Sequence, residues 1–277
     1  LAPWIIDLFV EHEVYVEPFG GSAAVLLRKE RSLIEVYNDL DLEVVNFFYV
    51  LREFPERLME LVALTPFALS EFDLSDSSFS SCHSYLSSVF VRDRPFDWVP
   101  CGKEREKMIE AARLFFVRSY LGMAGPTSSG RRGFRRQKVF SRGRNGDKVM
   151  TPAALSFMRT SHLRPLAERL RGVTIDCLDA LECLRRYDSE KTLFYVDPPY
   201  PRGVRMRRGK SYRHEMSDAD HKALLGLLRG LKGVVVLSGY ESQLYNDALA
   251  DWERYERQAR IDGAGSAGEV LWVKGVS

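Results

Sequence analysis

The sequence has little cysteine and no long apolar run. Its four cysteines, at positions 82, 101, 177 and 183, form no C-x-x-C pair and lack the spacing of metal ligands, so we expect reduced thiols and no metal site. No apolar stretch approaches the roughly 20 residues that span a bilayer, and no signal peptide is visible. These absences predict a cytoplasmic protein that does not bind a membrane.

Two further absences narrow the class of fold. The dinucleotide-binding pattern G-x-G-x-x-G is missing, and no internal repeat or long linker occurs. The 277 residues, of which 45% are hydrophobic, are enough for one large α/β domain with a smaller insert.

The most informative motif that is present is an apolar run ending in Asp197-Pro-Pro-Tyr200. Residues Leu193–Val196 predict a buried strand, because they are β-branched or aromatic and carry no charge. Two consecutive prolines fix φ and remove backbone donors, so the turn after the strand is stiff. The Asp197 carboxylate, the Pro198 carbonyl and the Tyr200 ring therefore suit a planar molecule with an amino group. The alternative is an ordinary turn at the end of a strand.

A second motif lies near the N-terminus. Residues Val14–Val16 predict a short strand that ends in Glu17; a loop of small residues follows, and we expect a helix from Ser22. This order is typical of a nucleotide-type cofactor site at the carboxyl end of a first parallel strand. The next predicted strand, Leu33–Tyr37, is followed by Asp39, an acid that can accept from both ribose hydroxyls of an adenosyl group.

Together these motifs resemble the N6-adenine DNA methyltransferases of the Dam-like, or D12, class, in which Glu-Pro-Phe-x-Gly binds S-adenosylmethionine and Asp-Pro-Pro-Tyr is catalytic. Segments 211–217, 237–240 and 269–272 resemble later family segments, in the expected order. The resemblance implies a Rossmann-like α/β fold with a mainly parallel sheet and an inserted, mostly helical DNA-recognition domain. It also implies methyl transfer to the N6 amine of an adenine flipped out of a specific double-stranded DNA sequence, with S-adenosylhomocysteine as product and no metal.

The resemblance also implies roles for individual residues. The expected catalytic residues are Asp197, Pro198, Pro199 and Tyr200. The expected cofactor-binding residues are Glu17, Pro18, Phe19, Gly20, Gly21, Ser22, Asn38, Asp39, Asp179 and Ala180. Asp179 equally suits the N-cap of a helix.

Two features depart from the family pattern. Ala23 stands where many relatives have a second loop glycine. The chain opens at Leu1-Ala-Pro-Trp4 without the Gly-Gly-Lys segment that relatives usually carry just before this point, so we expect either a trimmed chain or impaired cofactor binding. A catalytically impaired DNA-binding relative is therefore one alternative, and an N4-cytosine methyltransferase is another. Pro100-Cys101 has the residues of a cytosine-5 methyltransferase nucleophile, but it follows no predicted strand and would leave Asp-Pro-Pro-Tyr unexplained.

The formal net charge of +2 hides two basic stretches. Residues 131–148 hold eight basic residues and one acid, and residues 201–214 hold six basic residues and no acid. Cations interleaved with glycine and aromatic residues suit a phosphate backbone, because each one releases a counterion on binding. We expect His214 and His221, near the second stretch, to face solvent or phosphate. The expected DNA-binding residues are Arg118, Arg131, Arg132, Arg135, Arg136, Arg205, Arg207, Arg208 and Tyr212.

The order of predicted elements gives the domain layout. Strands that alternate with helices predict a mainly parallel sheet, whereas no strand alternation is evident between Leu51 and Met150. We therefore predict a catalytic domain of residues 1–51 and 151–277, with a target-recognition domain over residues 52–150, in a monomer. The other expected elements are strands at Val173–Asp176, Val234–Leu237 and Val270–Val273, helices at Val44–Leu51, Glu104–Leu121, Pro152–Leu170 and Asp218–Leu231, and a serine-rich loop at Ser75–Ser88.

Overall fold

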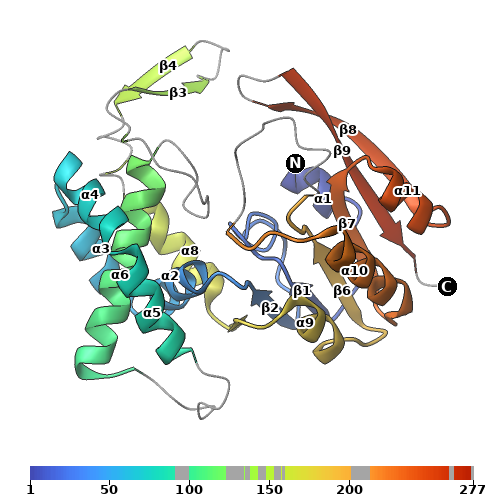
Figure 1. Ribbon diagram of the computed structural model, residues 1–277, viewed down its shortest axis with the longest axis horizontal. Coiled ribbons are helices and arrows are strands. Elements are labelled where there is room, and N and C mark those ends of the chain that lie inside the picture. Colours follow the sequence, from blue (N-terminus) through green and yellow to red (C-terminus); the bar gives the residue numbers. More distant parts are fainter. Residues whose placement is uncertain are drawn as a thin grey trace. The chain divides into compact units, whose positions relative to one another are not determined.

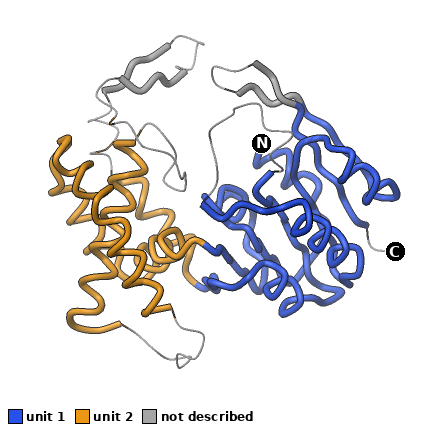
Figure 2. Tube along the Cα trace, viewed as in Figure 1, with its two compact units in different colours: residues 1–40, 172–277 blue, residues 41–171 orange. Residues whose placement is uncertain are grey.

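The chain forms two compact units in a computed structural model (Figure 2). Unit 1 comprises residues 1–40 and 172–277, and unit 2 comprises residues 41–171. The structure describes residues 1–90, 100–122, 134, 138–142, 148–152, 157, 160–200, 213–261 and 265–275.

Unit 1 is built on a sheet that has seven strands in the described residues, in the order β5-β2-β1-β6-β7-β9-β8 (Figure 1). The strands from β5 to β7 are parallel to their neighbours, and β9 runs antiparallel to β7 and β8. Each predicted strand is present, which confirms the mainly parallel α/β fold. The strands are β1 (Val14–Glu17), β2 (Ile34–Asn38), β5 (Val173–Asp176), β6 (Thr192–Val196), β7 (Val234–Tyr240), β8 (Glu253–Ile261) and β9 (Gly265–Lys274).

The strand order creates a switch point between β1 and β6. From β1 the chain moves outward to β2 and β5 on one side, and from β6 it moves outward to β7 on the other. Ligands of open α/β sheets bind at the carboxyl ends of the strands at such a point. Val16 pairs with Phe194 across it, so the loops after β1 and β6 leave the sheet side by side.

Short helices accompany the sheet of unit 1. They are α1 (Ala2–Ile6), α9 (Ala180–Arg186), α10 (Asp218–Gly230) and α11 (Gln243–Ala248). Helix α10 begins with a capping box between Ser217 and Asp220, which satisfies backbone donors at its first turn. Leu224 and Leu228 of α10 are buried in the core with Phe194 of β6. The helix expected from Ser22 does not form: residues 21–29 are mainly turns.

Unit 2 is mostly helical. Helix α6 packs against α2, α3 and α4, and the Phe47 ring of α2 lies 5.4 Å from the Phe115 ring of α6. Strands β3 and β4 pair as an antiparallel hairpin, which the sequence pattern did not indicate. The elements are α2 (Leu42–Glu53), α3 (Pro55–Leu64), α4 (Leu69–Ser77), α5 (Phe79–Val89), α6 (Gly102–Leu121), β3 (Lys138–Arg142), β4 (Lys148–Pro152), a 3-10 turn (Thr160–His162) and α8 (Leu163–Leu170).

The boundaries of unit 2 differ from those predicted for the insert. Helices α2 and α8, which we expected in the catalytic domain, belong to unit 2, because α2 packs its apolar face on α6 and α8 packs on α2. The expected continuous helix Pro152–Leu170 does not form, since Pro152 ends β4 and a 3-10 turn at Thr160–His162 precedes α8, which begins at Leu163. No helix in the described part of the chain is long and apolar enough to cross a membrane.

The serine-rich segment was predicted as a loop and is mostly helical, over α4 and α5. Its serine hydroxyls donate to carbonyls one turn earlier: Ser75 to Phe72, and Ser87 to His83. This local bonding satisfies the side chains inside a helix. Leu86 and Val89 then bury the apolar face of α5.

Candidate active site

Asn38, at the end of β2, connects two of the loops at the carboxyl edge of the sheet. Its side chain is fully buried. The amide nitrogen donates to the carbonyls of Pro18, at 2.9 Å, and Leu178, at 3.1 Å, while the amide oxygen accepts from the Leu178 N–H at 2.8 Å. Asn38 therefore holds the loop after β1 and the loop after β5 in fixed positions, and its polar atoms are directed at the protein.

The loop after β1 lies directly on the ring of Tyr37. A Cβ atom on Gly20 would come within 2.2 Å of that ring, so only glycine fits there without a shift. Gly21 has a φ of +47°; its N–H donates to Asp39 Oδ2 at 2.7 Å, and its carbonyl accepts from the Tyr37 hydroxyl at 2.8 Å. Ala23 has a φ of 52°, a conformation that favours glycine.

Glu17 supports this loop from the interior of unit 1. Its carboxylate is buried, and Oε1 accepts from the Tyr15 hydroxyl and from the Leu26 N–H, each at 2.7 Å. Burial raises the pKa of Glu17 to about 7, against these two hydrogen bonds. Because one donor lies on β1 and the other is the Leu26 N–H, Glu17 holds together the two ends of the segment between β1 and Leu26.

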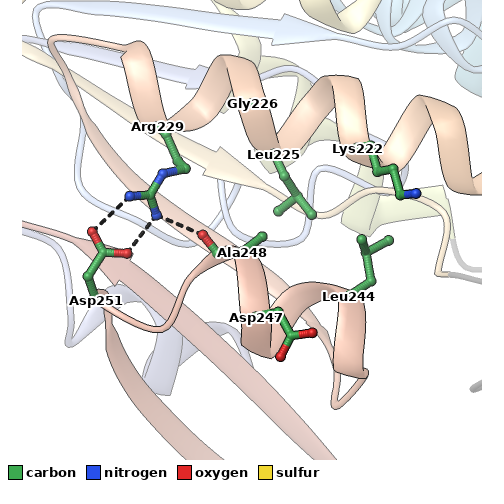
Figure 3. A pocket seen from close by; sticks show the side chains of 8 residues that line it. All are labelled: Lys222, Leu225, Gly226, Arg229, Leu244, Asp247, Ala248 and Asp251. Carbon is green, nitrogen blue, oxygen red and sulfur yellow. Dashed lines mark hydrogen bonds and ion pairs between the residues drawn. The ribbon is translucent and has the colours of Figure 1, made fainter.

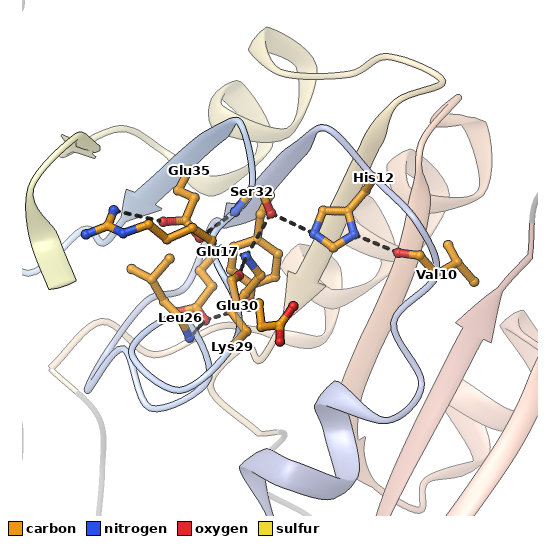
Figure 4. A network of polar contacts seen from close by, with 10 residues as sticks. Val10, His12, Glu17, Leu26, Lys29, Glu30, Ser32 and Glu35 are labelled. Carbon is orange, nitrogen blue, oxygen red and sulfur yellow. Dashed lines mark hydrogen bonds and ion pairs between the residues drawn. The ribbon is translucent and has the colours of Figure 1, made fainter.

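A polar network continues behind Glu17 (Figure 4). The buried Lys29 ammonium lies 4.4 Å from the centre of the Tyr15 ring and donates to Glu35 Oε1 at 2.7 Å. It also donates to the Ser32 hydroxyl at 2.8 Å, and that hydroxyl lies 2.9 Å from His12 Nε2. Burial lowers the pKa of His12. Sequence reasoning did not indicate this network, because its members form no contiguous motif.

The Asp197-Pro-Pro-Tyr200 motif follows β6, whose five residues are all buried. The Asp197 carboxyl group has its pKa raised to about 7, first by burial and then by the nearby Glu269 carboxylate, with a hydrogen bond from Tyr200 acting in the opposite direction. The Tyr200 hydroxyl donates to Glu269 Oε1 at 2.7 Å. Its ring lies 4.5 Å from the ring of Tyr240, inclined at 62°.

The geometry thus joins a glycine loop after β1, an acid after β2 and a carboxylate with an aromatic ring after β6. A family model described as D12 class N6 adenine-specific DNA methyltransferase matches residues 1–262. The chain belongs to this family. Its substrate class is therefore adenine in DNA, and the family implies S-adenosylmethionine as the cofactor in general. A search of curated proteins found no match to the chain.

Other residues predicted for the cofactor site of this methyltransferase lie around the same edge. Phe19 packs partly against the core and Ser22 is exposed. Asp179 is exposed and caps α9, accepting from the N–H groups of Leu181 at 2.9 Å and Glu182 at 3.3 Å. This is the helix-cap role that the sequence left open for Asp179.

Two basic residues of the methyltransferase are not where we expected them. Arg118 is fully buried, with its guanidinium on the Glu43 carboxylate and the Ser75 carbonyl. Since it is enclosed and paired, it cannot contact a phosphate in this structure, and we correct its role from DNA contact to folding of unit 2. His221 is also fully buried, 3.0 Å from the Tyr245 hydroxyl, so it does not face solvent. Outside the described residues lie Arg131, Arg132, Arg135, Arg136, Arg205, Arg207, Arg208 and Tyr212.

A pocket between α10 and α11 lies apart from the motifs (Figure 3). Arg229, on its rim, bonds both carboxylate oxygens of Asp251, at 2.6 and 3.1 Å, and the Ala248 carbonyl at 2.7 Å. Because Arg229 is paired with Asp251 and none of the motif residues lines the pocket, we assign the pocket no part in methyl transfer.

Sequence reasoning assigned no role to two residues that contact Tyr200. Glu269 and Ser238 lie on β9 and β7, and Ser238 donates to Glu269 Oε1 at 2.8 Å. The available signal was the acid itself, because Glu269 starts the otherwise apolar run that ends at Val273 and is buried in the sheet.

Proposed function

We propose that the chain transfers a methyl group from S-adenosylmethionine to the N6 amine of an adenine that is flipped out of double-stranded DNA at a specific sequence. The pairing of β1 with β6 carries this proposal. Because Val16 is in register with Phe194, the glycine loop and the Asp-Pro-Pro-Tyr turn emerge next to each other. A donor bound on one loop would lie beside an acceptor bound on the other.

The groups at the sheet edge fit an adenosyl cofactor. Asp39 is partly exposed at the end of β2, where a carboxylate can accept from ribose hydroxyls. Asp179, exposed after β5, can accept from the amine of the cofactor adenine, as the family resemblance implies. We propose that Phe19, Gly20, Gly21, Ser22 and Ala180 line the same site, while Glu17 and Asn38 hold its loops. When bound, S-adenosylmethionine would supply an electrophilic sulfonium methyl group.

The Asp-Pro-Pro-Tyr turn supplies the groups that act on the target amine. The N6 lone pair of adenine is delocalised into the ring, so the amine is a weak nucleophile. If Asp197 and the Pro198 carbonyl accept hydrogen bonds from the two N–H groups of this amine, they favour a pyramidal nitrogen. They also stabilise the positive charge that develops on the nitrogen during transfer. The raised pKa of Asp197, to about 7, with burial as its first cause, makes this carboxylate a better acceptor for the proton that leaves after transfer.

The target base must leave the duplex to reach this turn, because N6 is inaccessible inside a base stack. We propose that the Tyr200 ring stacks on the flipped adenine. The two basic stretches, residues 131–148 and 201–214, are proposed to bind the phosphates that flank it.

The test is a methylation assay with duplex DNA and a labelled methyl donor, followed by sequencing of the modified bases. The wild-type chain should form N6-methyladenine within one sequence context. Asp197→Ala should reduce kcat about 100-fold or more while cofactor affinity, measured by calorimetry, stays the same. Asp247→Ala, which removes an exposed aspartate of α11, is the matched control. An Asp197→Ala variant with more than about a tenth of wild-type turnover would contradict the assignment.

A further inference from the structure

Glu269 is a buried acid at the centre of a small hydrogen-bonded cluster. Only 6% of it is exposed, yet it lies on β9 between the apolar strands of unit 1. Oε1 accepts from the Tyr200 hydroxyl at 2.7 Å and from the Ser238 hydroxyl at 2.8 Å. The Tyr200 hydroxyl also lies 3.4 Å from Ser238 Oγ. The three side chains come from the turn after β6, from β7 and from β9.

The sheet holds the members of this cluster in place. Glu269 is paired with Tyr240, and Ser238 with Leu271, in the β7–β9 ladder. The ring of Tyr240 packs against the ring of Tyr200 at 4.5 Å. Tyr200 is therefore fixed at its hydroxyl by Glu269 and at its ring by Tyr240, which leaves little rotational freedom for the aromatic plane.

A buried carboxylate at this position is not expected to increase the stability of the fold. Removing an acid from water costs free energy that two hydroxyl donors only partly return, and an apolar residue would pack on β9 without that cost. The contact with Tyr200 of the Asp-Pro-Pro-Tyr turn offers a functional explanation for the buried acid. A precisely oriented ring and carboxylate in that turn would increase the rate of methyl transfer.

We propose that Glu269, supported by Ser238, is a positioning residue that sets the orientation of Tyr200 in the turn that carries Asp197. The inference rests on the proposed function and adds residues to the same site. Through Tyr200, Glu269 fixes the plane on which the target base stacks. The charge of Glu269 is also the second cause, after burial, of the raised pKa of Asp197, which favours transfer of a proton from the methylated amine to Asp197.

Other ionisable groups also act on Asp197, and they remain in every variant that changes Glu269 alone. Those in the described residues are Glu17 on β1, Tyr195 on β6, Tyr200 in the turn itself, Tyr240 on β7 and Tyr245 on α11. A change in the pH dependence of Glu269→Gln therefore reports the charge of Glu269.

The experiment compares Glu269→Ala, Glu269→Gln, Tyr200→Phe and the double variant Tyr200→Phe/Glu269→Ala in steady-state methylation. Glu269→Ala should lower kcat about 10- to 100-fold with unchanged affinity for S-adenosylmethionine, because the cofactor loops are not touched. Glu269→Gln keeps an oxygen acceptor of the same shape, so at pH 9 it should restore kcat to within about 3-fold of the wild type. Its activity should also extend to lower pH than that of the wild type, because a like charge beside Asp197 is removed.

The double variant separates positioning from general damage. If Glu269 acts through Tyr200, Tyr200→Phe/Glu269→Ala should have about the kcat of the slower single variant, because coupled changes do not add. Multiplied losses, an unchanged kcat in Glu269→Ala, or no rescue by Glu269→Gln would each overturn the inference.

Two controls keep these outcomes distinct. Should Glu269→Ala fail to fold, as judged by thermal unfolding, the pH profile of Glu269→Gln decides, and an unshifted profile overturns the inference. A wild-type chain that forms no N6-methyladenine overturns the proposed function and this inference together. Wild-type activity that the Glu269 variants share unchanged overturns this inference alone.

Discussion

Replacing Asp197 by asparagine should stabilise unit 1 at neutral pH while it abolishes methyl transfer. Burial and the nearby Glu269 carboxylate raise the pKa of Asp197 from its ordinary value of 3.8 to about 7. The ionised side chain is therefore less stable in the folded protein than in the unfolded chain. Asparagine has the same shape as aspartate, but it carries no charge.

The pKa difference sets the magnitude and the sign of this effect. From 3.8 to about 7 is a difference of about three pKa units, which at about 1.4 kcal/mol per unit is at most about 4 kcal/mol. The folded state binds the Asp197 proton more tightly than the unfolded chain does, so this group favours folding most below pH 4. This stabilising contribution of the bound proton is lost as the pH rises to about 7. Above that pH, Asp197 causes no further change in the free energy of unfolding. Because Asp197 is partly exposed, we expect a gain on the order of 2 kcal/mol at pH 8.

Urea unfolding followed by tryptophan fluorescence reports on unit 1 when it is carried out in a Trp98→Phe background. Trp98 falls in the residue range of unit 2. The other three tryptophans belong to unit 1: Trp4, Trp252 and Trp272. The free energies of unfolding of the wild type and Asp197→Asn should be similar near pH 4 and should diverge as the pH rises to 8. Asp247→Asn, a change at an exposed aspartate of α11, should show no such divergence.

Two results would refute the reasoning. If Asp197→Asn were destabilised equally at pH 5 and pH 8, the Asp197 carboxylate would have to stabilise the fold, and its surroundings would not disfavour the charge. If the variant kept activity, the charge of Asp197 would not be needed for transfer.

Three further outcomes follow from the charges and packing. Neutralising the four clustered arginines of the first basic stretch should flatten the log–log salt dependence of DNA binding by about 0.9 for each phosphate that is no longer neutralised, and an unchanged slope would place recognition in the second stretch. These four are Arg131, Arg132, Arg135 and Arg136. Arg118→Met removes the guanidinium that pairs with the buried Glu43 and should lower the free energy of unfolding in urea by about 3–5 kcal/mol. Adding Glu43→Leu should recover most of this loss. Unchanged stability together with weakened DNA binding would instead show that Arg118 contacts DNA. Gly20→Ala, whose Cβ would lie 2.2 Å from the Tyr37 ring, should weaken cofactor binding by about 1–3 kcal/mol in calorimetry, whereas Gly226→Ala, with nothing within 4 Å, should not.

The sequence alone determined six strands of unit 1 and the loops that carry the motifs, whereas β8 was not predicted. Apolar runs such as Leu193–Val196 are short, free of charge and stopped by proline, and their length together with their β-branched and aromatic residues favours a buried strand over a helix. The Glu17 and Asp197 motifs could be interpreted for the same reason: each is a contiguous set of residues whose chemistry is local. These signals require no knowledge of any distant partner.

Only the tertiary structure decided which polar residues are buried and what they contact. The serines of α4 and α5 are compatible with a loop until Leu86 and Val89 have a surface to pack on. Arg118 is indistinguishable from a DNA-binding arginine until it is placed beside Glu43.

The same is true of Asp197. The raised pKa of Asp197 depends in part on Glu269, a residue of β9 that lies far along the chain and contacts Tyr200 of the same turn. Such pairings arise from strand order and helix packing, and no spacing in the sequence records them, because the energy of a buried charge depends on its neighbours in space.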